Sequence, residues 1–171
     1  MEFAGTWGRG CPYMLSRINR LDQGNPVKIG NWISGGTYAM TSISGGCLCG
    51  SVRYRSAAPL GRSTLCHCSS CRRASGAHAL GLVTMAKDGF EFVAGVPAEY
   101  RSSASVIRTF CSKCGTPLTY WHLGWPQEIS VTISSLDTPA DAPPTDHTWM
   151  SEAISWDKPA DGLREYQTDR P

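Results

Sequence analysis

Residues 66–71 read CHCSSC, which places three cysteines within six positions of the chain. One residue separates the first two cysteines and two residues separate the next pair, so the three thiols can converge on one point. A disulfide knot, a structural metal knuckle and a reactive site all use closely spaced cysteines. Three is one ligand fewer than a closed tetrahedral zinc site needs. The remaining cysteines therefore decide how this stretch is interpreted.

Two further short motifs carry the other paired cysteines. Cys47 and Cys49 are separated by one residue, and Cys111 and Cys114 by two. A glycine follows each motif, and glycine permits the positive φ with which a knuckle turns beneath a metal ion. The two motifs together supply four sulfurs, which satisfy tetrahedral Zn²⁺ in a closed, structural site. Cys11 stands alone and is most simply a free thiol.

Cys66, Cys68 and Cys71 then supply three ligands and leave one coordination position open, which is the layout of a catalytic zinc site. Disulfides and an iron–sulfur cluster are the alternatives to zinc. A second structural zinc is a further alternative, and its fourth ligand would come from His67, His122 or Cys11.

Side chains next to this cluster would complete its chemistry. His67 is a candidate to orient the metal ligands, or to act as an auxiliary proton donor because its ordinary pKa lies near 6.5. Three thiolates on Zn²⁺ leave one net negative charge. Arg72 and Arg73 could offset this charge, or they could bind a substrate carboxylate. The alternative for both arginines is a solvated surface pair. His78 and His147 are expected to be ordinary surface or core residues.

Composition and charge restrict the class of protein. The chain has 171 residues, of which 41% are hydrophobic and 18% charged, as expected for one globular domain. Its net charge is +2, and that excess lies before residue 40, so the remainder is neutral and lacks the basic face that nucleic-acid binding needs. The apolar runs are too short for a membrane span or a signal peptide. We therefore expect no nucleic-acid or membrane partner, and a reducing, cytoplasmic location in which eight cysteines indicate metal rather than disulfides.

From Gly45 onward, short runs with a period of two alternate with Gly and Pro turns. Examples are SVRY at 51–54, FEFVAG at 90–95 and EISVTIS at 128–134, whereas DTPADAPPTDH at 137–147 is typical of a loop. This pattern predicts an all-β fold with short or no helices.

The domain is expected to span residues 43–171, with its core at about 43–156. Residues 1–42 have no sustained period and are interpreted as an extension that is dispensable or arises from upstream-extended translation ahead of Met40. The alternative is an ordered extension whose aromatic residues cover part of the core.

Four stretches together resemble a known family. They are SGGCLCGSVRY (44–54), CHCSSCRRASGA (66–77), FCSKCGTPL (110–118) and SSLD (134–137), and in this order they resemble the glutathione-dependent formaldehyde-activating enzymes, also called the CENP-V/GFA domain. The resemblance implies an Mss4-like fold of β-sheets that holds zinc, and a carbon–sulfur lyase that handles S-(hydroxymethyl)glutathione. It also implies two zinc ions per chain, with the outer motifs holding the structural ion and the cluster at 66–71 holding the second.

Two functions from different classes remain at this point. One is a zinc-dependent carbon–sulfur lyase that acts on a thiol–aldehyde adduct, with a small thiol such as glutathione as partner. The other is a non-catalytic zinc scaffold that binds a protein or a small molecule. The chain contains no recognisable glutathione-recognition segment, so the sequence leaves the thiol and the aldehyde open.

Overall fold

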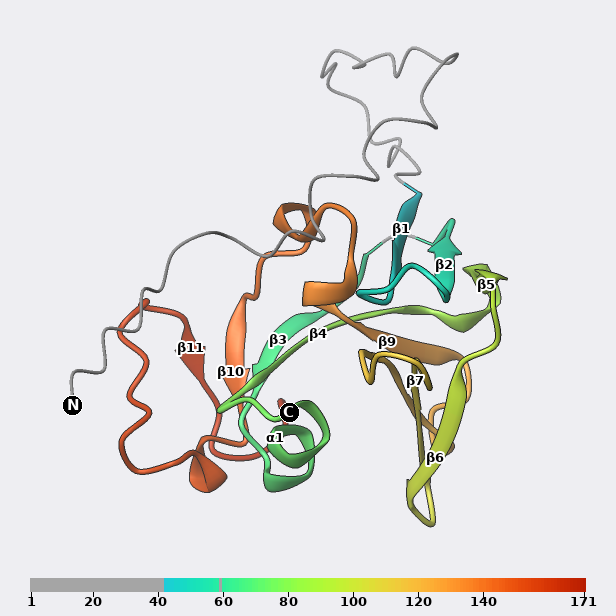
Figure 1. The fold of residues 1–171 in the computed structure, drawn as a ribbon. Coiled ribbons are helices and arrows are strands. Elements are labelled where there is room, and N and C mark those ends of the chain that lie inside the picture. Colours follow the sequence, from blue (N-terminus) through green and yellow to red (C-terminus); the bar gives the residue numbers. More distant parts are fainter. Residues whose placement is uncertain (1–41, 59) are drawn as a thin grey trace, which may run out of the picture. The chain divides into compact units, whose positions relative to one another are not determined.

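The structure is a computed structural model that describes residues 42–58 and 60–171 (Figure 1). The extension predicted for residues 1–42 lies outside the described residues except at its last position, so its role stays a prediction. The described residues form β-strands, short 3-10 helices and one α-helix, α1 (Ser69–Ser75). This confirms the predicted all-β, Mss4-like fold class with short helices. No helix in these described ranges is long and apolar enough to cross a membrane.

The strands form two sheets. The smaller sheet is antiparallel in the order β1-β2-β5, from β1 (Ile43–Gly46), β2 (Arg53–Ser56) and β5 (Phe90–Ala94). The larger sheet has eight strands. From edge to edge they are β11 (Arg164–Glu165), β10 (Asp146–Thr148), β3 (Ser63–Cys66), β4 (Leu80–Ala86), β9 (Glu128–Thr132), β8 (Pro117–His122), β7 (Val106–Phe110) and β6 (Ala98–Ser103). In this sheet β10 runs parallel to both neighbours, and the other pairs are antiparallel.

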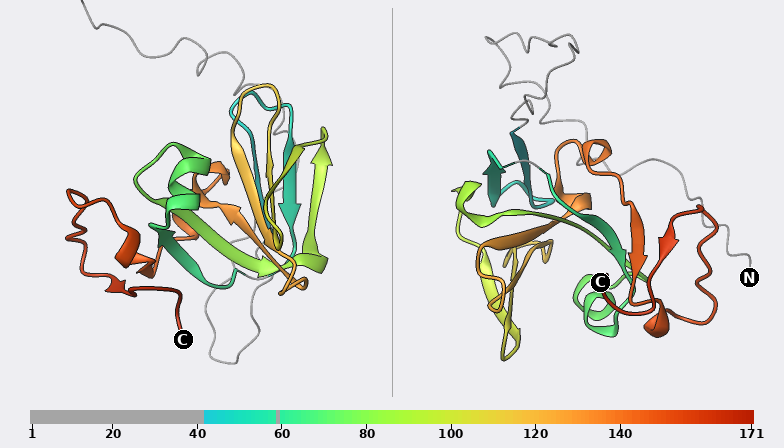
Figure 2. Two further views of the ribbon diagram at one scale, coloured as in Figure 1. Left: turned by 90° about the horizontal axis from the view of Figure 1, so that it is seen from below. Right: turned by 180° about the vertical axis from the view of Figure 1, so that it is seen from behind.

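In the described part of the chain, the helix α1 and four 3-10 turns connect these strands. The 3-10 turns are η2 (Lys87–Gly89), η3 (Ile133–Ser135), η4 (Pro139–Asp141) and η5 (Met150–Glu152). The larger sheet arches from β10 and β3 through β4 to β6, and α1 lies beneath the arch, as both the front and rear views show (Figures 1 and 2).

Period-two alternation separates a hydrophobic face of the larger sheet from a polar one. Val83 in β4 and Val131 in β9 are buried in a core that also includes Tyr54 from the smaller sheet. The residues adjacent to them, Thr84 and Ser130, point to the opposite face, where their hydroxyls lie 2.8 Å apart. Because side chains alternate along a strand, one face is free to build a polar site while the other packs the core.

Candidate metal and substrate site

The first cysteine cluster joins the two sheets. Cys47 and Cys49 follow β1, whereas Cys111 and Cys114 lie in the turn between β7 and β8. The four sulfurs all lie within 4.8 Å of one another, and Sγ of Cys49 is 3.5 Å from that of Cys47 and 3.8 Å from that of Cys111. Sulfurs placed about 2.3 Å from one tetrahedral Zn²⁺ would be about 3.8 Å apart. The donor set and its spacing therefore fit zinc.

Glycines shape both turns of this cluster. Gly50 and Gly115 have φ values of 73° and 76°, the left-handed conformation expected from the sequence. The N–H of Gly50 donates to the carbonyl of Cys47 over 2.9 Å, and that of Gly115 donates to the carbonyl of Cys111 over 2.8 Å. Each turn thereby closes on itself and directs its pair of thiols toward the other pair.

Hydroxyl groups favour the thiolate form of two of these cysteines. The Thr116 side chain lies 3.2 Å from Sγ of Cys114 and lowers the pKa of that thiol to about 5. The Ser51 side chain likewise lowers the pKa of Cys49, from which it is 3.2 Å away. Because metal ions bind thiolates rather than thiols, these contacts prepare the cluster for a metal.

The second cluster is local in sequence. Cys66 is the last residue of β3, Cys68 is the N-cap of α1, and Cys71 lies in the first turn of that helix. The N–H of Cys71 donates to Sγ of Cys68 over 3.3 Å, which caps the helix with a sulfur. The three sulfurs lie within 4.8 Å of one another, so this donor set also fits a metal ion.

Close approach of the thiols separates their pKa values. The thiols of Cys66 and then Cys71 donate to Cys68, which lowers the pKa of Cys68 to about 2. The same contact with Cys68 raises the pKa of Cys66. These contacts thus favour the thiolate form of Cys68 and the thiol form of Cys66.

All three of these cysteines line a cavity of about 340 Å³. Its walls come from the polar face of the larger sheet, the first turn of α1 and the C-terminal segment. They include the hydroxyl side chains of Thr64, Thr84, Ser130 and Thr148. The first cluster does not contribute to this cavity. Of the two clusters, the three-cysteine cluster is therefore the one that lines a cavity able to hold a small polar molecule.

The structure places a different arginine beside the cluster from the two considered in the sequence. Arg72 donates to the carbonyl of His67 over 3.1 Å and to that of Glu152 over 3.2 Å, and Arg73 is exposed. Arg108 from β7 instead lines the cavity, with Nη2 3.5 Å from Sγ of Cys71. Sequence reasoning missed Arg108 because 37 positions separate it from Cys71.

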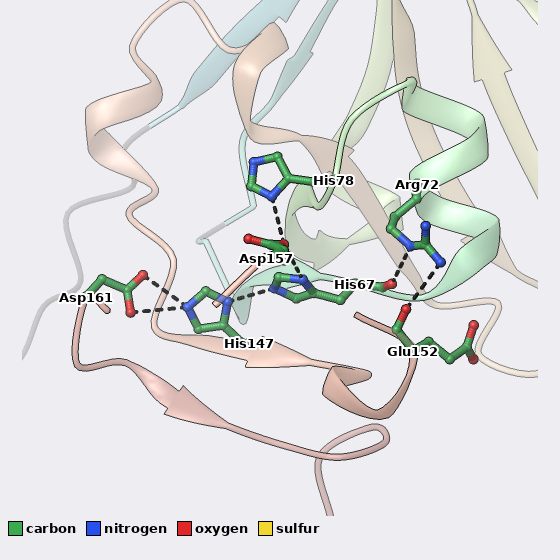
Figure 3. A network of polar contacts seen from close by, with 7 residues as sticks. All are labelled: His67, Arg72, His78, His147, Glu152, Asp157 and Asp161. Carbon is green, nitrogen blue, oxygen red and sulfur yellow. Dashed lines mark hydrogen bonds and ion pairs between the residues drawn. The ribbon is translucent and has the colours of Figure 1, made fainter. Parts of the chain in front are cut away.

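His67 is buried and belongs to a network of polar contacts (Figure 3). Its Nε2 is 2.9 Å from Nδ1 of His147, and Nε2 of His147 is 3.0 Å from Asp161. On the other side, Nδ1 of His67 is 3.2 Å from Asp157, which also contacts His78 over 2.8 Å. Burial lowers the pKa of His67, and its side chain does not line the cavity. These contacts suit an orienting residue, and the auxiliary proton-donor role stays a prediction.

The domain is all-β and carries two cysteine clusters whose geometry suits metal ions. One has four cysteines, and the other has three and lines a cavity. These features define a class of thiol-rich folds that could bind metal ions. The chain belongs to the glutathione-dependent formaldehyde-activating enzyme family, whose model matches residues 42–152. A Halomonas elongata protein named "Putative glutathione-dependent formaldehyde-activating enzyme" is 31% identical over 123 residues, which cover 67% of this chain and 78% of that protein.

The fold was also compared with solved structures. The crystal structure of a Rhodobacter sphaeroides protein is similar with a TM-score of 0.48 and 21% identity, covering 72% of this chain and 98% of that one. A likeness at this level adds nothing to the family assignment.

Proposed function

We propose that this protein is a zinc-dependent carbon–sulfur lyase that makes or breaks the adduct of a small thiol and an aldehyde. The observation that carries the proposal is the three-cysteine cluster on the wall of a cavity, where a fourth ligand can approach. Cys66, Cys68 and Cys71 would hold one zinc there, and Cys47, Cys49, Cys111 and Cys114 would hold a structural zinc. Glutathione and formaldehyde are the first substrates to test, because they appear in the name of the family.

Zinc at the open cluster would supply a Lewis acid that lowers the pKa of a bound thiol. In the direction of synthesis, a thiolate attacks the aldehyde carbon, the carbon–sulfur bond forms, and the carbonyl oxygen takes up a proton. In the direction of cleavage, the hydroxyl proton leaves, the carbonyl re-forms, and the thiolate departs.

The chain's own groups would orient and neutralise these species. The Thr84 and Ser130 hydroxyls are hydrogen-bonded to each other, so one of them keeps a free O–H that can donate to a carbonyl or carboxylate oxygen from the floor of the cavity. Arg108 places a permanent positive charge beside Cys71, which offsets the negative charge of a sulfur-rich site. We also propose a reducing, cytoplasmic location, since this chemistry requires the seven cysteines to stay free, as they are in the described residues.

The test is exchange at equilibrium, measured by NMR, between a free thiol and its hydroxymethyl adduct. Thiols add to formaldehyde without a catalyst, so net formation alone is a poor measure. The zinc-loaded wild type should accelerate exchange for at least one thiol in a broad panel, and Cys68→Ser should not. Equal exchange rates with wild type, with Cys68→Ser and without protein would reject the lyase and favour the non-catalytic zinc scaffold.

A further inference from the structure

Three arginines line the cavity, and two of them already have carboxylate partners. Arg62 lies 3.1 Å from Glu128, and Arg170 lies 2.6 Å from Asp146. Within the described ranges, no carboxylate forms an ion pair with the third, Arg108. The cavity therefore contains one positive charge that is free to pair with an anionic ligand.

The acidic side chains that line the cavity have partners elsewhere. In addition to the Glu128 pair, a carboxylate oxygen of Glu152 accepts the N–H of Ser69 over 2.8 Å at the start of α1. Asp169 accepts the N–H of Arg170 over 2.9 Å. These contacts hold the acidic groups in place and leave Arg108 as the cation available to a ligand.

The guanidinium of Arg108 is also fixed in position. Its carbon lies 4.9 Å from the centre of the Tyr120 ring, its Nε donates to the Ser102 hydroxyl over 3.3 Å, and its Nη2 donates to Sγ of Cys71 over 3.5 Å. A guanidinium has five N–H donors, so three remain after these two bonds. A fixed fork of donors recognises a carboxylate better than a neutral group of the same size.

We infer that Arg108 makes this cavity selective for thiols that carry a carboxylate, an inference that rests on the proposed function because the thiol must first reach the open cluster. Three thiolates on Zn²⁺ would leave one net negative charge, which otherwise repels a ligand that carries a second one. Arg108 reverses that preference locally, since it stands beside both the cluster and the space that the ligand enters. It is a specificity-determining residue on β7, and its position next to the cluster comes from the pairing of the strands.

Three probes of nearly equal size test the inference: 3-mercaptopropionate, 2-mercaptoethanol and cysteamine, which differ only in a negative, neutral or positive end group. Their dissociation constants are measured with cobalt-substituted protein, from the change in its visible spectrum, for wild type and for Arg108→Met. Comparing the two proteins for each probe cancels the intrinsic differences between the thiols. Arg108→Met should raise the dissociation constant of 3-mercaptopropionate about tenfold, as expected for one lost hydrogen bond to a charged group. It should raise that of 2-mercaptoethanol less than about twofold.

The controls separate charge near the cluster from charge in general. Arg101→Met removes an exposed arginine of β6 that donates to the Ala104 carbonyl and does not line the cavity, and it should leave all three constants unchanged. Arg108→Lys keeps the charge, should retain part of the selectivity, and replaces Arg108→Met if that variant does not fold.

Three results would overturn the inference. If Arg108→Met raises the dissociation constants of all three probes by the same factor, Arg108 affects only the binding of the sulfur that the probes share. An effect of Arg101→Met as large as that of Arg108→Met would show that net charge alone is responsible. If no thiol perturbs the cobalt spectrum of the wild type, the open site itself is absent, and the proposed function fails together with this inference.

Discussion

The buried ion pair between Arg170 and Asp146 should contribute strongly to stability. Asp146 lies in β10, inside the larger sheet, and its side chain is 6% exposed, whereas that of Arg170 is 17% exposed. The Nη2 of Arg170 lies 2.6 Å from the carboxylate and also donates to the Ser63 carbonyl over 3.0 Å. Arg170→Met therefore leaves a buried carboxylate without its cation.

The expected cost follows from this burial. Removing one partner of a fully buried pair costs about 3–5 kcal/mol, and the partial exposure of Arg170 favours the lower end, about 3 kcal/mol. For a domain of this size that corresponds to a fall of about 6–12 °C in the melting temperature. The double variant Asp146→Asn, Arg170→Met removes both charges, so it should be more stable than Arg170→Met alone.

Arg55→Met is the matched control, because Arg55 and Glu91 are also 2.6 Å apart but are 65% and 56% exposed. An exposed pair contributes about 0–1 kcal/mol, so this variant should melt within a few degrees of wild type. Melting temperatures are measured by calorimetry on the zinc-loaded proteins. The reasoning is refuted if Arg170→Met and Arg55→Met lower the melting temperature equally, or if the double variant is no more stable than Arg170→Met.

Three further predictions concern metal, pH and chain length. Cys114→Ser should be unfolded, because binding of the structural zinc contributes about 10–16 kcal/mol to the free energy of folding. Cys68→Ser should fold and hold one zinc. Equal zinc contents of wild type and Cys68→Ser in elemental analysis would contradict this prediction. Hydrogen bonding from Arg53 lowers the pKa of Asp137. The ionised Asp137 therefore stabilises the fold above its ordinary pKa of about 3.9, and this contribution is lost as the pH falls below that value. From pH 6 to pH 3, the melting temperature of Asp137→Asn should fall less than that of wild type. A chain that begins at Met40 should keep its zinc and melt within a few degrees of the full chain, and a larger fall would show that residues 1–39 stabilise the domain.

Local patterns in the sequence predicted the strands and the grouping of the cysteines well. The alternation in EISVTIS predicted β9, and the glycines after each cysteine motif predicted the positive φ at Gly50 and Gly115. These features depend on neighbouring residues only, so no knowledge of the tertiary structure is needed. The short α1 was not predicted, because Cys71 is its one buried residue and no helical period of apolar residues precedes it.

Features that depend on strand pairing could not be read from the sequence. The loop predicted for residues 137–147 was wrong at its end: Asp146 and His147 belong to β10, because β3 and β11 supply the hydrogen-bonding partners of this strand. That pairing brings His147 to His67, which lies 80 positions earlier. In the same way, the position of Arg108 beside Cys71 results from the curvature and register of the larger sheet, for which a single sequence gives no signal.

The two cysteine clusters differ in what a metal ion would do for each. The first cluster joins residues 62 positions apart, across two sheets, so a metal there closes a long loop and opposes separation of the sheets. The second lies within one strand end and one turn of helix, where the backbone already holds the thiols together and a metal closes almost no loop. Ligand exchange at the second cluster therefore costs the fold little, whereas the same exchange at the first would loosen the domain. This difference in sequence separation is a physical reason to place the proposed reactive position at Cys66, Cys68 and Cys71.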